Sequence, residues 1–512
     1  MKKILLAAMA LAAVAGCSMQ PEPLSPAEIA DAVGADAKTI ADSEEPLAGP
    51  LDLPHSMARA VKFNLQHRLL LMEQALAQRS FELAKMDMLP VLAGTGSYTD
   101  RNNFNASSSE NVITHQQSLV PSYSEDRARW TVDARFSWNI LDFGVSYLQA
   151  RQESNRFLVA TLARRKTMEK LVQQVRTSFW RAAVMQQITP EVDELQERAT
   201  TALVALQQIR SEQLRAPLAT LEDIRALMEI SQQLEALRQS ASAAQTDLAQ
   251  LINLRPDKNV SLDIPAELPP LPFFQPDFPR MEDRALVNSS DYTAEIYKER
   301  VDRDESRKAL LRLMPGVELF KSITYDSNSF LWSNNWETAG ARVNWNIMRV
   351  LSLPDITDNN EARTQVAQAR RLATHMAVIT KVHLAWQRYA DTMARLDRAQ
   401  KLDNLDSDIV QLSAQALESE ATSGIADLKN RMRGLRSRVT SSLAYAEAQD
   451  AFALFLQSLG VHPIPDDYQH HSVDDLAAHI GAEFDRYTDG ALTDLASPTA
   501  EGTPVTPSAS TT

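Results

Sequence analysis

An internal duplication constrains the fold of this chain more than any other feature of its sequence. The tripeptide Trp138-Asn139-Ile140 returns as Trp345-Asn346-Ile347, 207 residues later. The landmarks that follow keep intervals of 41, 38 and 39 residues in both copies, namely Trp138, Phe179, Pro217 and Pro256 in the first and Trp345, Trp386, Gly424 and Pro463 in the second. A repeat of this length predicts two copies of one structural unit.

The two copies differ in length at one place. Upstream of the tryptophans, Met88-Leu89-Pro90 matches Leu313-Met314-Pro315 at an offset of 225. The first copy therefore carries 18 extra residues between its proline and its tryptophan.

Each copy contains a stretch in which apolar and polar residues alternate. The pattern runs from Thr131 to Ile140 in the first copy and from Gly340 to Ile347 in the second. A period of two predicts a strand with one apolar and one polar face. Weaker partner strands are expected near Val91 to Thr99 and near Val317 to Tyr325, which makes two hairpins and four strands in all.

Apolar residues recur at alternating steps of three and four in the rest of each copy, the period of coiled-coil helices. One such series is Leu227, Ile230, Leu234, Leu237, Ala241, Ala244, Leu248 and Leu251. We expect a long helix from Gly144 to Arg215, and two shorter helices from Leu51 to Met88 and from Leu218 to Leu254 that together match its length. The predicted fold class is mainly α with a small β part and an internal duplication.

The duplication also organises the chain into segments. Seven prolines between Arg255 and Pro279 exclude a helix and predict an extended connector. The residues from Ser497 onward lack apolar periodicity and are expected to be disordered. The predicted segments are a signal peptide at 1–16, a linker at 17–50, the first repeat at 51–254, the connector at 255–279, the second repeat at 280–463, and an equatorial segment with a disordered tail at 464–512.

The first residues have the form of a bacterial export signal. Lys2 and Lys3 precede an apolar stretch from Ile4 to Val14, which is too short to span a membrane as a mature helix. The stretch ends in Val14-Ala15-Gly16-Cys17, which resembles a lipobox, and Cys17 is the only cysteine of the chain. We expect Cys17 to be acylated, and the Ser18 that follows it favours the outer membrane.

Charge and motif content argue against several classes of function. The chain has 52 basic and 66 acidic residues, a net charge of -14, whereas nucleic-acid binders concentrate Lys and Arg. No phosphate-binding loop, nucleophile motif or paired-carboxylate pattern is present, so we expect no enzyme and no cofactor. His470 and His471 are adjacent and nothing nearby completes a metal site, so no metal is expected either.

A strand pair with an apolar outer face and a polar inner face suits a transmembrane barrel. Four strands cannot close a barrel around a lumen, and open sheet edges are not tolerated in lipid. The chain is therefore expected to oligomerise, and three copies would supply twelve strands.

The sequence resembles the TolC-like outer-membrane efflux proteins over roughly Leu51 to Pro463. The resemblance is carried by the duplicated order of proline, strand, loop, strand and helix, by the segment Ser137-Trp138-Asn139-Ile140-Leu141-Asp142-Phe143-Gly144, and by the stretch Arg176-Thr177-Ser178-Phe179-Trp180. It implies a homotrimer with a twelve-stranded barrel in the outer membrane and a long coiled-coil α-barrel across the periplasm. It also implies two partners, a periplasmic adaptor protein and an inner-membrane transporter.

Strand parity and helix length then predict functional surfaces. The residues expected to face lipid are Phe136, Trp138, Val343 and Trp345. Those expected to line the lumen are Asp133, Arg135, Asn139, Arg342 and Asn344, where the two arginines would tune passage or pair with Asp133. The residues expected at the periplasmic tips, as a gate and adaptor contact, are Glu222, Asp223, Glu420, Gly424 and Asp427. Alternatively, the tip carboxylates only offset helix dipoles on a solvated end.

Two other functions fit parts of this pattern. An outer-membrane component of type I protein secretion would have the same fold and a different cargo. A periplasmic coiled-coil scaffold lipoprotein would share the lipobox and the heptads, but it would not need two amphipathic hairpins.

Overall fold

The computed structural model describes residues 23–42, 45–47, 49–212, 216–255, 258, 260–265, 268–272, 275–465 and 467–488. Cys17 and the expected disordered tail lie outside these residues. The chain divides into two compact units, Met1–Pro50 and Leu51–Thr512. In the first unit, the described residues form helix α2 (Pro26–Asp42), within the segment expected to be a linker.

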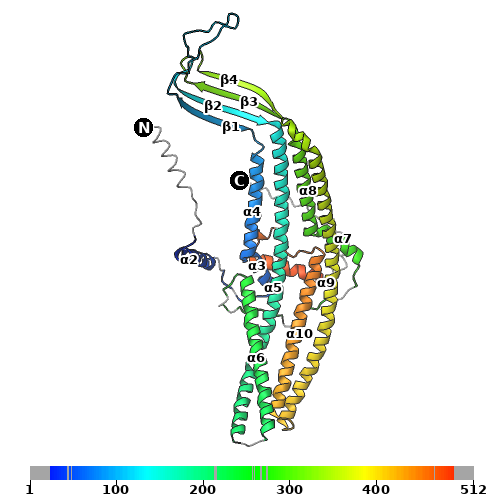
Figure 1. Cartoon of the computed structure of the whole chain (residues 1–512). Helices are drawn as coiled ribbons and strands as arrows, with labels where there is room; N and C mark the ends of the chain where they lie inside the picture. Colours follow the sequence, from blue (N-terminus) through cyan, green and yellow to red (C-terminus); the bar gives the residue numbers. More distant parts are fainter. Residues whose placement is uncertain are drawn as a thin grey trace. The chain divides into compact units, whose positions relative to one another are not determined.

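The second unit contains the two copies (Figure 1). The first copy comprises α3 (Leu53–Phe63), α4 (Leu65–Met86), β1 (Val91–Asp100), β2 (Ala128–Asn139), α5 (Ile140–Ser211) and α6 (Pro217–Leu251). The second comprises α7 (Phe278–Asn288), α8 (Ser290–Leu311), β3 (Gly316–Asp326), β4 (Asn335–Asn344), η1 (Ile347–Ser352), α9 (Leu353–Glu418) and α10 (Gly424–Ser458). The short η2 (Tyr468–His470) and α11 (Val473–Thr488) follow. The predicted duplication and the mainly helical fold class are confirmed.

Two long helices organise the helical part. Helix α5 has 72 residues and α9 has 66, which correspond to roughly 100 Å each at about 1.5 Å per residue. Helix α5 contacts α4 and α6 on one side and α8 and α10 on the other, and α9 contacts α8 and α10. Pairs of shorter helices therefore accompany each long helix end to end, as expected from the sequence (Figure 1).

The expectation of one helix from Leu51 to Met88 is wrong, because the chain breaks at Asn64. The backbone of Asn64 is extended (φ -63°, ψ 123°); its N–H caps α3 by donating to the Ala60 carbonyl, and its side chain accepts from His67 N to begin α4. Ser289 is likewise extended between α7 and α8, and its side chain accepts from Tyr292 N to begin α8. Asn and Ser are preferred N-cap residues, since a short polar side chain satisfies a free backbone N–H.

The four strands form one antiparallel sheet in the order β1-β2-β3-β4. The hairpins β1–β2 and β3–β4 were predicted, and pairing of β2 with β3 joins them, with Trp138 opposite Leu319. The extra residues of the first copy lie in the β1–β2 loop, at 101–127, whereas the β3–β4 loop occupies only 327–334.

The last strand is shorter than its sequence pattern predicts. The alternation continues to Ile347, but β4 ends at Asn344 and the chain forms the 3₁₀ helix η1 from Ile347. Trp345, which we assigned to the strand, lies beyond it, and its indole N–H donates to the Leu313 carbonyl at 3.0 Å. The start of α9 differs from that of α5 because Pro354 lies in its first turn, where it lacks a backbone N–H.

One hydrophobic core cluster lies where α7, α9 and α10 meet. Its largest buried side chains include Tyr389 and Phe455, and Trp386 packs against it. The proline-rich connector runs beside this core, since its Pro269 and Pro272 carbonyls accept hydrogen bonds from Tyr445 and Tyr389. The described connector residues contain no helix before Phe278, as expected.

Candidate functional site

One face of the sheet is largely apolar, and the described chain leaves it exposed; Lys321 and Glu337, which lie opposite Phe136 and Ile323, form an ion pair on it at 3.0 Å. Along β2, Trp130, Val132, Phe136 and Trp138 lie on this face with exposed fractions of 58%, 51%, 44% and 37%. In register with them are Leu92 on β1, Leu319, Ile323 and Tyr325 on β3, and, further along, Val343 on β4. An apolar surface of this size on a strand pair indicates contact with lipid or with another apolar surface.

The opposite face carries a cluster of charges centred on Glu318. Arg135 Nη2 lies 2.9 Å from Glu318 Oε1, and Arg342 Nη1 lies 3.8 Å from Oε2. Both guanidinium groups also lie over the ring of Phe320, at 4.6 and 5.6 Å from its centroid. The ring in turn covers Gly340, where a Cβ would be 2.9 Å from Phe320 Cζ. Two cations and one carboxylate leave this cluster with an excess positive charge.

The other residues expected in the lumen have different surroundings. The sequence left open whether the arginines pair with Asp133; instead Asp133 accepts a hydrogen bond from Thr324 Oγ1 at 2.7 Å. Asn139 is the last residue of β2 and caps α5, because its Oδ1 accepts from Leu141 N at 3.0 Å. Asn344 lies exposed at the end of β4, opposite Gly316.

The expected tip residues lie around the two turns at the far ends of α5 and α9 from the sheet (Figure 1). Glu222 is exposed on α6 and Asp223 is half-buried on the same helix. Glu420 has a positive φ of 58° in the turn after α9, and Gly424 begins α10 with open space around the position of a Cβ.

Asp427 differs from the other tip residues because its carboxylate is buried and has partners within the chain. It is 2% exposed, accepts from Ser413 Oγ at 3.0 Å, and pairs with Arg431 Nε at 2.7 Å. At the offset of 207, Asp427 corresponds to Thr220, and Asp223 corresponds to Asn430. The two aspartates therefore occupy different positions of the repeat. Their gate role stays a prediction.

Comparison with known proteins shows that outer-membrane channels share this fold. No family model matches the sequence, and no curated protein sequence matches it. Solved structures do match: the outer membrane channel CmeC of Campylobacter jejuni has a TM-score of 0.64 at 11% identity, covering 84% of this chain and 89% of its own. The chain has the fold of the TolC-like outer-membrane channels.

Two further TolC-like structures agree with this result. The MtrE outer membrane channel of Neisseria gonorrhoeae, in its open state, matches with a TM-score of 0.61 at 15% identity, over 80% of this chain and 88% of that one. The outer membrane protein VceC of Vibrio cholerae matches with a TM-score of 0.59 at 14% identity, over 80% and 96%. At these identities the likeness concerns the fold.

Near the middle of the TolC-like helical part, α5 carries buried ionisable groups. His462 Nδ1 lies 2.6 Å from the Glu169 carboxylate. Burial raises the pKa of Glu169, but His462, Gln457 and Arg165 together lower it by more, and the pKa lies below its ordinary value. Arg176 lies about two turns further along α5. Burial lowers its pKa to about 10, and its guanidinium lies 4.0 Å from the centroid of the Phe484 ring. Glu169, His462, Arg176 and Phe484 border a small cavity of about 40 Å³.

A second buried group ties the C-terminal segment to the first repeat. His67 Nδ1 bonds to the Val61 carbonyl at 2.8 Å, and its Nε2 lies 3.3 Å from the hydroxyl of Tyr468. Arg164 donates to the same hydroxyl at 3.1 Å. Burial lowers the pKa of His67, which favours its neutral form.

Sequence reasoning missed Glu318 and the buried groups of α5. Glu318 stands between the apolar Val317 and Leu319, a parity typical of the polar face, but its arginine partners on β2 and β4 gave no local signal. The sequence did contain a signal for the helix breaks, since Asn64 and Ser289 stand at the offset of 225 already seen at the prolines. Partners of Arg176 and Glu169 come from residues hundreds of positions away and had no such signal.

No helix among the described residues has both the length and the apolar character needed to cross a membrane. Within the part of the chain that the structure describes, no three His, Cys, Asp or Glu side chains gather as a metal site.

Proposed function

We propose that this protein is the outer-membrane channel of a tripartite efflux system. Three copies would form a passive duct that carries substrate from an inner-membrane transporter and a periplasmic adaptor to the exterior. Phe136, Trp138 and Val343 would face lipid, and Arg135, Arg342 and Asp133 would face the lumen. Acylation of Cys17 would add a lipid anchor in the outer membrane.

The observation that carries the proposal is a four-stranded sheet with one largely apolar face, one charged face and two edges that no other described strand pairs. Edge β1 and edge β4 present backbone groups that lipid cannot satisfy, so a membrane sheet of this kind must close on itself. Three copies would close it with twelve strands, enough to surround a lumen. Joining β4 of one copy to β1 of the next is a head-to-tail contact, which closes into a ring.

The edges of the helical part support the same assembly. Helix α4 lies at one edge and exposes an apolar series at heptad spacing, Leu65, Leu69, Met72, Leu76, Leu83 and Met86. Helix α9 lies at the other edge and exposes Val366, Leu372, Met376, Leu402, Leu405 and Leu412. Exposed apolar side chains along both edge helices fit contact with helices of neighbouring copies.

Cysteine accessibility at two adjacent β3 positions tests the proposal. Ser322 lies opposite Arg135 on the charged face, and Ile323 lies opposite Ala134 on the apolar face. In intact outer membranes, Ser322→Cys should react with a small charged thiol reagent, and Ile323→Cys should react much more slowly. The wild-type chain is the blank, because an acylated Cys17 has no free thiol.

Two outcomes would contradict the proposal. Faster labelling of Ile323→Cys than of Ser322→Cys would reverse the faces of the sheet. Equal and rapid labelling of both would place the sheet in water, as expected for a periplasmic scaffold.

The molar mass of the purified protein, measured by light scattering in detergent, should equal three chains. Cargo is tested separately, by measuring whether deletion of the gene raises accumulation of small toxic molecules or stops secretion of a protein.

A further inference from the structure

The β1–β2 loop is much longer than the β3–β4 loop, its counterpart in the second copy. Residues 101–127 fold back on themselves through antiparallel bridges between Ser107 and Ser122 and between Glu110 and Gln117. The chain reverses where His115, with a positive φ of 51°, donates its N–H to the Asn111 carbonyl at 2.9 Å. The loop is therefore a hairpin that extends past the end of the sheet (Figure 1).

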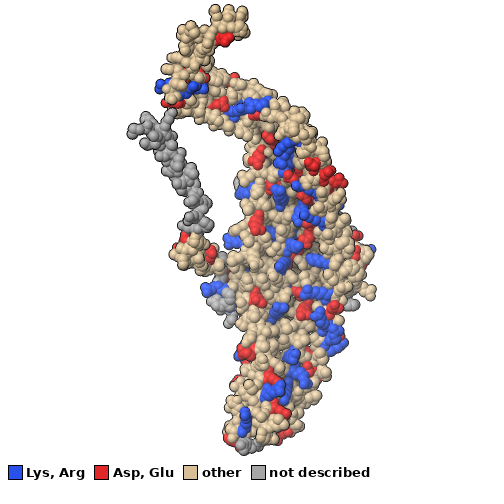
Figure 2. All heavy atoms as spheres, in the orientation of Figure 1, with Lys and Arg blue, Asp and Glu red and all other residues tan. Residues whose placement is uncertain are grey.

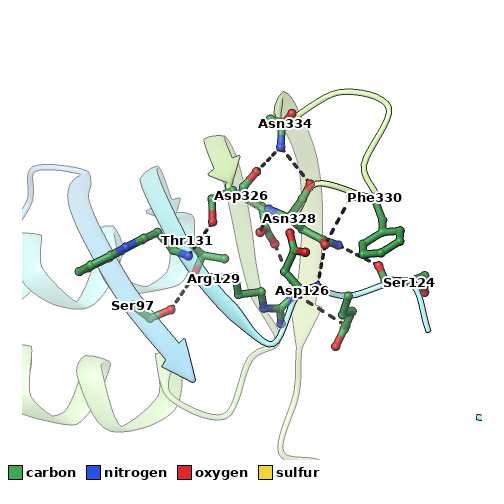
Figure 3. A network of polar contacts seen from close by, with 12 residues as sticks. Ser97, Ser124, Asp126, Arg129, Thr131, Asp326, Asn328, Phe330 and Asn334 are labelled. Atoms are coloured by element: carbon green, nitrogen blue, oxygen red, sulfur yellow. Dashed lines mark hydrogen bonds and ion pairs between the residues drawn. The ribbon is translucent and has the colours of Figure 1, made fainter. Parts of the chain in front are cut away.

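The base of this hairpin is fastened to the β3–β4 loop of the same chain (Figure 3). Asn328 is 3% exposed; its Nδ2 donates to the Ser124 carbonyl at 3.0 Å, and its Oδ1 accepts from Asp126 N at 3.0 Å. The ring of Tyr123 contacts that of Phe330 at 5.3 Å. These contacts set the direction in which the rest of the hairpin leaves the sheet.

The outer part of the hairpin carries four highly exposed apolar side chains. Val112, Ile113, Leu119 and Val120 have exposed fractions of 87%, 88%, 93% and 77%. Residues 111–120 contain no Asp, Glu, Lys or Arg, and the visible surface of the loop is almost free of charge (Figure 2). Four apolar side chains this exposed on one loop indicate a surface that is covered in the assembled protein.

A matching apolar surface lies on the other hairpin loop. Trp332 is completely exposed, and Leu331 beside it is 37% exposed. The two loops leave the same end of the sheet, because β1 and β3 both run antiparallel to β2. The long loop joins the two strands at the β1 edge, and residues 327–334 join the two strands at the β4 edge.

We propose that the tip of the β1–β2 hairpin, formed by Val112, Ile113, Leu119 and Val120, packs against Trp332 of the partner subunit. The inference rests on the proposed trimer, in which β1 of one copy lies beside β4 of the next. That arrangement brings the long loop of one copy next to the short loop of its neighbour at the external end. The hairpin then holds two neighbouring subunits together at the β1–β4 junction, a contact called the latch below. One such hairpin per chain is enough for each junction, which explains why only the first copy of the repeat has it.

Cross-linking between differently tagged chains tests the latch. One chain carries Ile113→Cys and the other Trp332→Cys, and both are expressed together and treated in cells with a short bismaleimide. A covalent dimer that carries both tags is expected. The matched control replaces Trp332→Cys with Thr357→Cys on α9, which lies at the opposite end of β4 from the loop and should give no tagged dimer.

The outcomes separate the latch from the trimer itself. A trimeric mass without the mixed dimer overturns the latch and leaves the proposed function standing. Strong linking of Ile113→Cys chains to each other overturns it as well, because the tips would then meet on the channel axis. A monomeric mass overturns both proposals. As a second readout, Trp332→Ala should lower the temperature at which the trimer dissociates in detergent, and Ser333→Ala should not.

Discussion

Replacing Asp427 with alanine should loosen the turn between α9 and α10. The carboxylate is buried, and the change removes its hydrogen bond to Ser413 and its 2.7 Å pair with Arg431. A hydrogen bond to a charged group contributes about 1.5–3 kcal/mol, and breaking a buried pair costs up to about 5 kcal/mol. Because the Arg431 side chain stays 27% exposed and can return to water, we expect the loss to be about 2 kcal/mol.

Hydrogen–deuterium exchange of the intact trimer measures this loss locally. A change of about 2 kcal/mol corresponds to roughly 30-fold faster exchange of amides whose opening is limited by this contact. Peptides covering residues 405–430 should exchange faster in Asp427→Ala, and peptides of the sheet should not change. Glu222→Ala is the control, since Glu222 is exposed on α6 and its loss should leave exchange unchanged.

Conductance decides between a structural and a gating role for Asp427. If the carboxylate only holds the turn together, single-channel conductance should rise only together with faster exchange. Higher conductance and weaker cation preference, with unchanged exchange at residues 405–430, would refute this reasoning. That result would mean that Asp427 contributes to a ring of charges around the entrance.

Three further predictions follow from other contacts. Gly460→Ala should lower the thermal stability of the trimer by several degrees, because Gly460 has a φ of 76° and a Cβ there would lie 2.3 Å from Asn288 Cβ. Glu169→Gln should lower the free energy of unfolding at pH 7 and make that free energy depend less on pH in acid. The folded pKa of Glu169 lies below 4.5, so the stability that its carboxylate contributes is present above pH 4.5 and is lost as the pH falls through the folded pKa. Glu318→Gln should shift ion selectivity in planar bilayers toward anions, because both arginines that it pairs with keep their charge; unchanged reversal potentials would place this cluster away from the ion path.

Local patterns in the sequence predicted the elements and their order. The offset of 207 and the period of two at Trp138 and Trp345 were sufficient to predict two hairpins and the long helices between them. These predictions succeed because an apolar face forms when apolar residues recur at a fixed spacing within one helix or strand. That spacing can be read from a single stretch of sequence. The breaks at Asn64 and Ser289 were also encoded locally, as helix caps, and were overlooked.

Other features depended on residues far apart in the chain. The alternation at Trp345 and Ile347 predicted a longer strand, but β4 ends where β3 no longer offers a partner, because Gly316 is the first residue of β3 and pairs with Asn344. The pairing of β2 with β3, which turns two hairpins into one sheet, likewise has no local signal.

Charged residues show most clearly what the sequence determined and what only the tertiary structure decided. Their positions on a strand or helix followed from the sequence, and so did the expectation that Arg135 and Arg342 share a face. Only the tertiary structure decided that both arginines meet Glu318 rather than Asp133, and that Asp427 is buried against Ser413. A pattern of a few residues determines which way a side chain points, whereas its partner is chosen by strand register and helix packing, which bring together residues that the sequence separates by up to hundreds of positions.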